Sequence, residues 1–180
     1  MGAISFVVRF VVSHQNNDFA SSDGTYELSY SGYWSEPEES LPAPHMMPAG
    51  TQVDLLLEAE DAMFIAAHAP APGPASSFTR IDEAAVRQGF ESAAFGATLE
   101  EWSIPGKRDI AGERALLEAA GYAEMNGMRA DFDVAMSVTD GAQPQMVMFI
   151  HSCIEAGCEK STAEFDKILE SVSYNEEVAT

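Results

Sequence analysis

The four histidines are the side chains of this chain best suited to bind a metal or to act as a general base. They are His14, His45, His68 and His151, and none has a His or Cys partner at the spacing typical of a zinc site. His68 and His151 fall in two predicted strands and would meet only if those strands were neighbours. We therefore expect hydrogen-bonded or surface histidines in preference to a metal-ligand pair.

Acidic residues within and just after the first of two apolar runs are the other candidates for a cation site. They are Asp54, Glu58, Glu60 and Asp61, but the sequence has no Asp-x-Asp-x-Asp-Gly loop, which excludes an EF-hand. It also has no glycine-rich phosphate loop and no Gly-x-Ser-x-Gly elbow, and no serine can be paired with a base by spacing. We expect no catalytic residue, no metal, no cofactor and no enzymatic activity. A hydrolase would need a side-chain cluster that the sequence does not reveal.

The two cysteines, Cys153 and Cys158, are separated by a predicted turn at Ala156-Gly157. Their spacing matches no zinc knuckle or redox motif. The turn brings their Cα atoms within disulfide range. In an oxidising compartment they would form a bridge and in the cytosol they would stay free thiols, so both states remain open.

Acidic residues outnumber basic ones by 29 to 9, which gives a formal net charge of -20. This charge repels phosphate backbones and anionic lipid, so we expect neither nucleic acid nor a bare membrane surface as a partner. It favours a basic protein, a cation, or simple solubility. No apolar run reaches the roughly 20 residues that cross a bilayer, so no direct membrane span is expected.

Strand patterns dominate the first half of the chain. Residues 19–30 predict a hairpin with its turn at Asp23-Gly24. Residues 53–59 and 63–69 are apolar runs that predict two more strands, the second more buried than the first.

The prolines of residues 35–50 predict an irregular loop, in which Met46-Met47 either fills the core or is exposed. This loop, with the preceding Trp34, is the candidate partner-binding segment. The other predicted elements of this half are a helix at residues 79–91 and a strand at residues 99–104 that ends at Pro105-Gly106.

A long antiparallel meander is the clearest feature of the second half. Asn126-Gly127 is a strong hairpin signal between residues 113–125 and 128–138, and Asp140-Gly141 leads into a strand at residues 145–153. Intrinsic propensity favours helix at residues 114–121. We predict a strand there, because the alternating run 128–138 needs a neighbouring partner.

A terminal helix is predicted at residues 161–172, with a capping box formed by Ser161 and Glu164. Its apolar positions recur at helical spacing and predict one buried face.

Three pieces of the chain together resemble the PsbP-like, or DcrB-like, domains, which share their fold with the Ran-binding Mog-type proteins. The pieces are the hairpin leading to Trp34, the Gly-x-x-Ala that starts at Gly112, and the Phe-x-x-Ile-Leu-x-Ser that starts at Phe165. The resemblance implies an antiparallel sheet with helices packed on it, with Trp34 under the sheet and Phe165 docking the last helix. It also implies an accessory or binding role, and many members are exported or lipid-anchored.

These observations predict an α+β fold with an antiparallel, meander-rich sheet of about six to seven strands and helices packed on it. We expect residues 1–18 to be an N-terminal extension or the remnant of an export signal, residues 19–174 a single PsbP/DcrB-like domain, and residues 175–180 a tail. The expected function is a non-enzymatic accessory or protein-binding domain whose acidic surface steers a partner. The alternative is a small-ligand or cation carrier with a pocket between sheet and helices. The resemblance favours an extracytoplasmic location over a cytoplasmic one.

Overall fold

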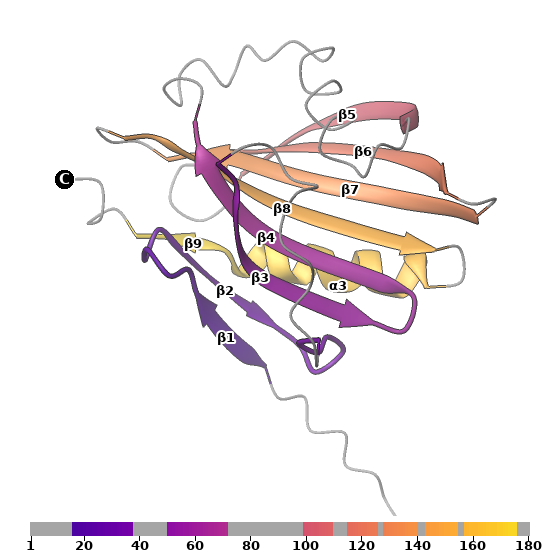
Figure 1. Cartoon of the computed structure of the whole chain (residues 1–180), viewed down its shortest axis with the longest axis horizontal. Helices are drawn as coiled ribbons and strands as arrows, with labels where there is room; N and C mark the ends of the chain where they lie inside the picture. The colour runs from indigo at the N-terminus through magenta and orange to yellow at the C-terminus, as the bar shows by residue number, and fades with distance from the viewer. Residues whose placement is uncertain are drawn as a thin grey trace, which may run out of the picture.

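The computed structural model describes residues 16–37, 50–71, 99–109, 115–125, 128–139, 143–154 and 157–175, and these contain nine strands and one helix. The elements are β1 Asn17–Ala20, β2 Tyr26–Tyr30, β3 Gln52–Ala59, β4 Ala62–Pro70, β5 Leu99–Asp109, β6 Ala115–Met125, β7 Met128–Val138, β8 Gln145–Ile154, α3 Cys158–Ser171 and β9 Ser173–Tyr174. β1, β2 and β9 form a small antiparallel sheet, and the others form a large one in the order β3-β4-β8-β7-β6-β5 (Figure 1).

The predicted α+β class with an antiparallel sheet is confirmed, but the strand count differs. Instead of one sheet of six or seven strands, the described residues form a 3-stranded and a 6-stranded sheet. The small sheet joins distant parts of the chain, because Tyr26 of β2 pairs with Tyr174 of β9. A strand as short as β9 has no alternating pattern of its own, so its sequence did not reveal it.

The predicted hairpins lie where the sequence placed them. β1 and β2 pair antiparallel across the turn that contains Gly24, whose φ of 71° suits a residue without a Cβ. β3 pairs with β4, which is the more buried of the two. Residues 115–125 form a strand rather than a helix, and Met125 pairs with Met128 on either side of Asn126-Gly127, which lie outside the described residues.

The predicted end of β5 was wrong. This strand continues through Pro105-Gly106 to Asp109, with shifts of register on either side of Ser103. β5 is an edge strand of the large sheet, so the missing N–H of a proline need not interrupt a second ladder. The two register shifts allow β5 to continue through Pro105 and Gly106, which a regular central strand would not tolerate.

The predicted capping box was also wrong. α3 begins at Cys158, its N-cap is Gly157, and no side chain caps it. Ser161 lies one turn inside the helix, where its hydroxyl bonds to the backbone oxygens of Gly157 and Cys158. Glu164 accepts instead from Ser31 of the chain before β3, at 2.6 Å. Tertiary contacts therefore recruit both residues that the capping box would have used.

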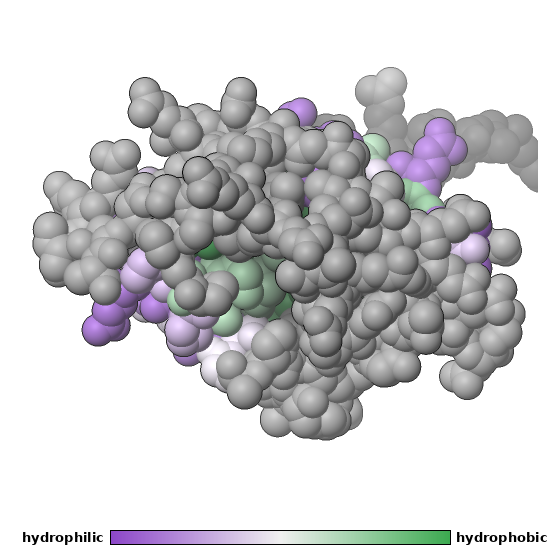
Figure 2. Space-filling view, turned by 90° about the horizontal axis from the view of Figure 1, so that it is seen from above, coloured by the Kyte–Doolittle hydropathy of each residue, from purple (hydrophilic) through white to green (hydrophobic). Residues whose placement is uncertain are grey.

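The large sheet carries an apolar cluster on each face. We call inner the face whose Phe64 and Phe149 pack against Phe165 and Leu169 of α3 and against Tyr26 of the small sheet. The outer-face cluster includes the buried residues Ile65, Ala67, Phe132, Val134, Met136 and Met148. Figure 2, a view from above, shows a group of apolar residues in a hollow near the middle of the molecule, with hydrophilic residues beside it at the lower left.

Other predictions fall on residues that the structure does not describe. These are the N-terminal residues 1–15, Met46 and Met47, the helix at residues 79–91, and the Asp140-Gly141 turn. Within the described part, no helix is long and apolar enough to cross a membrane.

Replacing Gly157 by Ala is expected to destabilise the protein. A Cβ at this position would lie 2.6 Å from the Cβ of Asp61, too close for two carbon atoms. Relief requires a backbone shift where β8 turns into α3, and we expect a loss of about 1–3 kcal/mol in the free energy of unfolding. Urea unfolding of G157A beside the wild type measures this loss. An unchanged midpoint would contradict the close approach of Gly157 to Asp61.

Candidate functional site

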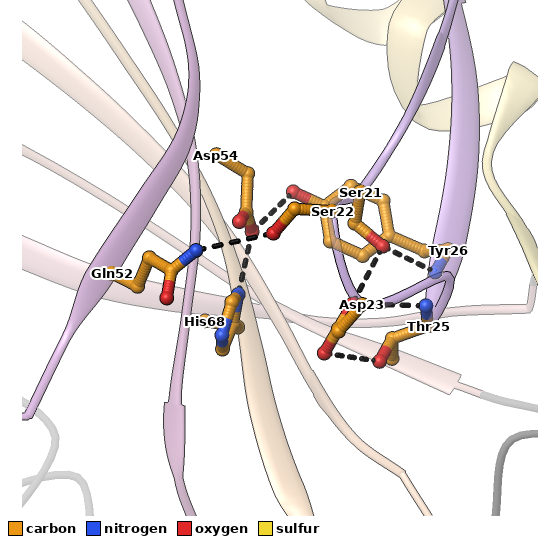
Figure 3. Close-up of polar contacts among 8 residues, drawn as sticks. All are labelled: Ser21, Ser22, Asp23, Thr25, Tyr26, Gln52, Asp54 and His68. Atoms are coloured by element: carbon orange, nitrogen blue, oxygen red, sulfur yellow. Dashed lines mark hydrogen bonds and ion pairs between the residues drawn. The ribbon is translucent and has the colours of Figure 1, made fainter.

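A buried Asp–His pair joins the small sheet to one end of the large sheet. The carboxylate of Asp54 lies 2.7 Å from Nδ1 of His68 on β4, and the hydroxyl of Tyr26 donates to the same oxygen, Oδ2, at 3.0 Å. The register of β3 against β4 shifts between Val53 and Leu55, so Asp54 sits in an irregularity of the strand. Its carboxylate lies among inner-face neighbours, and Figure 3 shows it bonded to Tyr26 and His68.

Burial makes this carboxylate unusual. The side chain of Asp54 is 0% exposed and that of His68 is 13% exposed. The second oxygen of Asp54, Oδ1, is buried and has no hydrogen-bond partner. A buried acceptor without a donor is costly, and such atoms are rare in folded proteins.

The turn between β1 and β2 forms the rim of this site. Asp23 accepts hydrogen bonds from the hydroxyls of Ser21 at 2.8 Å and Thr25 at 2.6 Å, and from the backbone N–H of Thr25 at 3.0 Å. Burial alone would raise the pKa of Asp23. The hydrogen bonds from Thr25 and Ser21 and the nearby His68 outweigh burial, so its pKa lies below the usual value and the group is anionic at neutral pH.

Tyr26 is a permanent donor in this cluster. Burial raises the pKa of its hydroxyl strongly, and the neighbouring Asp54 raises it further. The phenol therefore stays protonated and donates to Asp54 throughout the physiological range. A second hydrogen bond, between exposed residues, also connects the β1–β2 turn to the large sheet. Nε2 of Gln52 donates to Oγ of Ser22 at 3.1 Å, and we call this pair the latch.

A second Asp–His pair lies on the inner face near α3. Nδ1 of His151 is 3.0 Å from Oδ2 of Asp133, and its Nε2 is 3.0 Å from Oγ of Ser161. The imidazole is fully buried and stacks on Phe165, with ring centroids 5.3 Å apart. Trp34 packs edge-on against the same ring.

This connectivity is that of a Ser-His-Asp triad, but the geometry is closed. Both His151 and Ser161 are 0% exposed, so no substrate carbonyl reaches the hydroxyl. Oγ of Ser161 also lies 2.9 Å from the backbone oxygen of Gly157, to which it donates. Every polar atom of the ring has a protein partner, and the arrangement suits a satisfied buried polar network.

The two histidines lie on neighbouring strands but do not meet. His68 is opposite Val147, and His151 is opposite Phe64 four positions away on β4. Each histidine binds its own aspartate instead. Neither aspartate could be assigned from sequence, because the pairings span 14 and 18 residues and depend on strand register.

The candidate cation cluster is not assembled. Asp54 points to His68, whereas Glu58 and Glu60 are exposed near the turn between β3 and β4. Among the residues that the structure describes, no three His, Cys, Asp or Glu side chains are grouped to hold a metal ion.

Trp34, predicted as part of the candidate partner-binding segment, is a buried residue. Only 3% of it is exposed, and it packs against Tyr33, Phe64 and His151 within the inner-face core. This placement agrees with the packing role that the family resemblance implies. Met46 and Met47 lie outside the described residues.

Cys153 and Cys158 are joined by a disulfide, with their Cα atoms 5.2 Å apart. The bridge ties the end of β8 to the first turn of α3, beside the His151–Ser161 contact. We expect protein prepared under oxidising conditions to show no free thiol when denatured without reductant. Reduction should lower the free energy of unfolding by about 2 kcal/mol, the loop-entropy effect of a short ring. Two free thiols in the unreduced sample would contradict the bridge.

No protein-family model matches the chain, and no curated protein matches it. Several solved structures resemble it, and two of them are described here. A crystal structure from Bacteroides thetaiotaomicron VPI-5482 superposes with a TM-score of 0.50 at 16% identity, over 91% of this chain and 50% of that one. LpqN of Mycobacterium tuberculosis, described as involved in cell envelope biogenesis, gives 0.49 at 15% identity, over 88% of this chain and 90% of its own. This chain thus spans about half the length of the first neighbour, and the likeness is one of fold alone.

Proposed function

We propose that this chain is a non-enzymatic accessory domain that binds a basic protein partner, and that it belongs to the DcrB/PsbP-like domains. The observation that carries the proposal is the uncompensated acidity of its surface.

The basic side chains that the structure describes are already engaged. Arg129 lies 2.7 Å from Asp131 and over the ring of Tyr122, and Lys167 lies 2.6 Å from Glu164. Lys160 lies over the ring of Tyr33, 4.5 Å from its centroid. Exposed acidic residues without an ion pair in the described part include Glu58, Glu60, Glu159 and Glu170. Their field attracts a basic surface and speeds its approach.

The Ser161–His151–Asp133 network does not favour a hydrolase. A nucleophile must be reached by its substrate, and here both Ser161 and His151 are enclosed by core side chains. The space between the inner face and α3 is filled by Phe64, Phe149 and Phe165, so the described residues give no support to a ligand pocket there. Labelling of Ser161 by a fluorophosphonate probe in the folded protein would contradict the non-enzymatic part of the proposal.

The disulfide favours an oxidising compartment, since such bridges are rare in the cytosol of most organisms. An exported accessory domain is consistent with that chemistry.

The test is affinity capture with the whole chain, from soluble and envelope fractions of the source organism, at about 50 mM and about 300 mM salt. We expect one basic protein to be enriched at low salt and lost at high salt, because exposed charges are screened over about 10 Å at 0.1 M. A matched variant with Glu58, Glu60, Glu159 and Glu170 replaced by Gln should capture it several-fold less. No enriched protein in either fraction, or capture that is insensitive to salt and to the variant, would overturn the proposal.

A further inference from the structure

We propose that the Asp54–His68 pair is a binding site for a primary ammonium group, presented as a lysine side chain of the basic partner. The inference rests on the proposed function for the source of the lysine. The site itself is defined by the contacts of the described residues.

Unsatisfied acceptors gather at this end of the large sheet. Four buried side-chain atoms of the described residues lack a hydrogen-bond partner, and three of them are oxygens, on Thr51, Asp54 and Gln145. Gln145 is opposite Pro70, two residues along β4 from His68 and therefore on the same face. A site with missing donors calls for a ligand that donates hydrogen bonds.

His68 supplies a further acceptor. In the neutral tautomer whose Nδ1–H donates to Asp54, the other ring nitrogen, Nε2, has a lone pair. No described side chain bonds to that nitrogen, and the ring is the partly exposed member of the pair. His151 differs, because its two nitrogens face Asp133 and Ser161 and its ring is sealed in the core.

The charge of the site favours a cation. The site is built around the carboxylate of Asp54, and no Lys or Arg among the described residues forms an ion pair with it. Asp23 at the rim is anionic and lies close enough to act on His68 electrostatically. A buried carboxylate that no Lys or Arg pairs with gains from a ligand that brings a positive charge.

An ammonium group fits this site better than a metal ion. The described residues do not group three metal-binding side chains here, whereas an ammonium needs only acceptors and provides three donors. A guanidinium is planar and demands a wider, paired arrangement of oxygens. Lysine is thus the basic side chain that the geometry selects.

Because the side chain of Asp54 is 0% exposed, a ligand reaches it only if the surface opens, and we place that opening at the latch between Gln52 and Ser22. Both residues are exposed, their bond is neutral, and it spans the gap that Tyr26 and Asp54 also bridge (Figure 3). Such an exposed bond contributes little, so opening it is easy. Ser22→Ala should therefore tighten binding about two- to fivefold, in line with the modest net worth of one hydrogen bond.

The experiment is NMR titration of the whole oxidised chain with Nα-acetyl-lysine methylamide, followed on the histidine ring signals. The norleucine analogue is the neutral control. We expect the lysine compound to shift the ring signals of His68 saturably while those of His151 stay unchanged. Asp54→Asn should weaken binding at least about tenfold. Asp133→Asn, the matched change in the other Asp–His pair, should leave the affinity unchanged.

Several outcomes would overturn the inference. They are no response of His68 to the lysine compound at about 100 mM, an equal response to norleucine, or equal affinity in D54N and wild type. A stronger response to calcium chloride or to spermidine would also overturn it, since the site would then serve a metal or a free polyamine. The norleucine comparison uses the wild type alone, so it holds even if D54N fails to fold.

The inference and the proposed function can fail separately. If D54N still captures the basic partner as well as the wild type does, and capture remains sensitive to salt, the lysine site is wrong and the proposed function stands. A saturable lysine response at His68 with no partner captured would do the reverse.

Discussion

Replacing Phe64 by Ala is expected to lower the free energy of unfolding by about 3–5 kcal/mol. Phe64 is fully buried and touches three other rings of the inner-face core, those of Trp34, Phe149 and Phe165. Truncation removes those contacts and leaves a cavity at the point where β4, β8 and α3 meet. Rigid backbone on both sides of the site limits collapse, which places the loss at the upper part of the range for large-to-small changes.

Denaturant unfolding followed by circular dichroism gives the measurement. Val53→Ala on the neighbouring strand is the matched control, since Val53 is 37% exposed and its truncation should change the free energy of unfolding by less than about 0.5 kcal/mol. A loss below about 1 kcal/mol in F64A would show that Phe64 is not at the centre of the core.

His151→Ala is the second large change, with an expected loss of about 3 kcal/mol. The substitution removes a ring stacked on Phe165 and leaves Ser161 and Asp133 without their partner. Part of the loss is a packing defect, and part is the desolvation of polar groups that stay behind. His151→Gln should recover some of the stability, because an amide can still bond to one of the two partners.

Urea midpoints of H151A, H151Q and the wild type separate these contributions. Asp133→Asn is the control for charge, since the side chain of Asp133 is 30% exposed and its loss should destabilise less than the loss of the ring. If D133N lost as much unfolding free energy as H151A, the contact between His151 and Asp133, rather than the packing of the ring on Phe165, would be the main source of stability here.

Local patterns predicted the hairpins because each carried its own signal. The turn at Gly24 needs a positive φ, and the alternation in 128–138 required a strand partner strongly enough to overrule the helix propensity of 114–121. In both cases the information lies within a few residues of the feature that it specifies.

Features fixed by tertiary contact were missed or misplaced. The capping box failed because Ser161 turns to His151 and Glu164 turns to Ser31, choices that the local sequence does not encode. β5 continued past its proline because it lies at an edge, which is a property of the sheet order rather than of the strand.

The candidate site was beyond the sequence for a related reason. Asp54 lies where the register of β3 shifts, between Val53 and Leu55, so local alternation does not identify His68 as its partner. The bond from Tyr26 comes from a different sheet. The sequence identified Asp54 and His68 only as separate candidates for chemistry, not as a pair.

The closing of the small sheet has a consequence for biosynthesis. β2 lies between β1 and β9, and the hydroxyl of Ser171 bonds to the backbone of Ser29, 142 residues earlier in the chain. During translation the β1–β2 hairpin is therefore made long before β9, and one edge of β2 stays unpaired until the residues of α3 and β9 have been synthesised. Chain synthesis proceeds at about 5–20 residues per second. An unpaired strand edge promotes aggregation, and β2 also carries Tyr26, Leu28 and Tyr30, which are buried only in the folded protein. The yield of folded protein in cells should therefore depend on how quickly β9 is synthesised and pairs with β2.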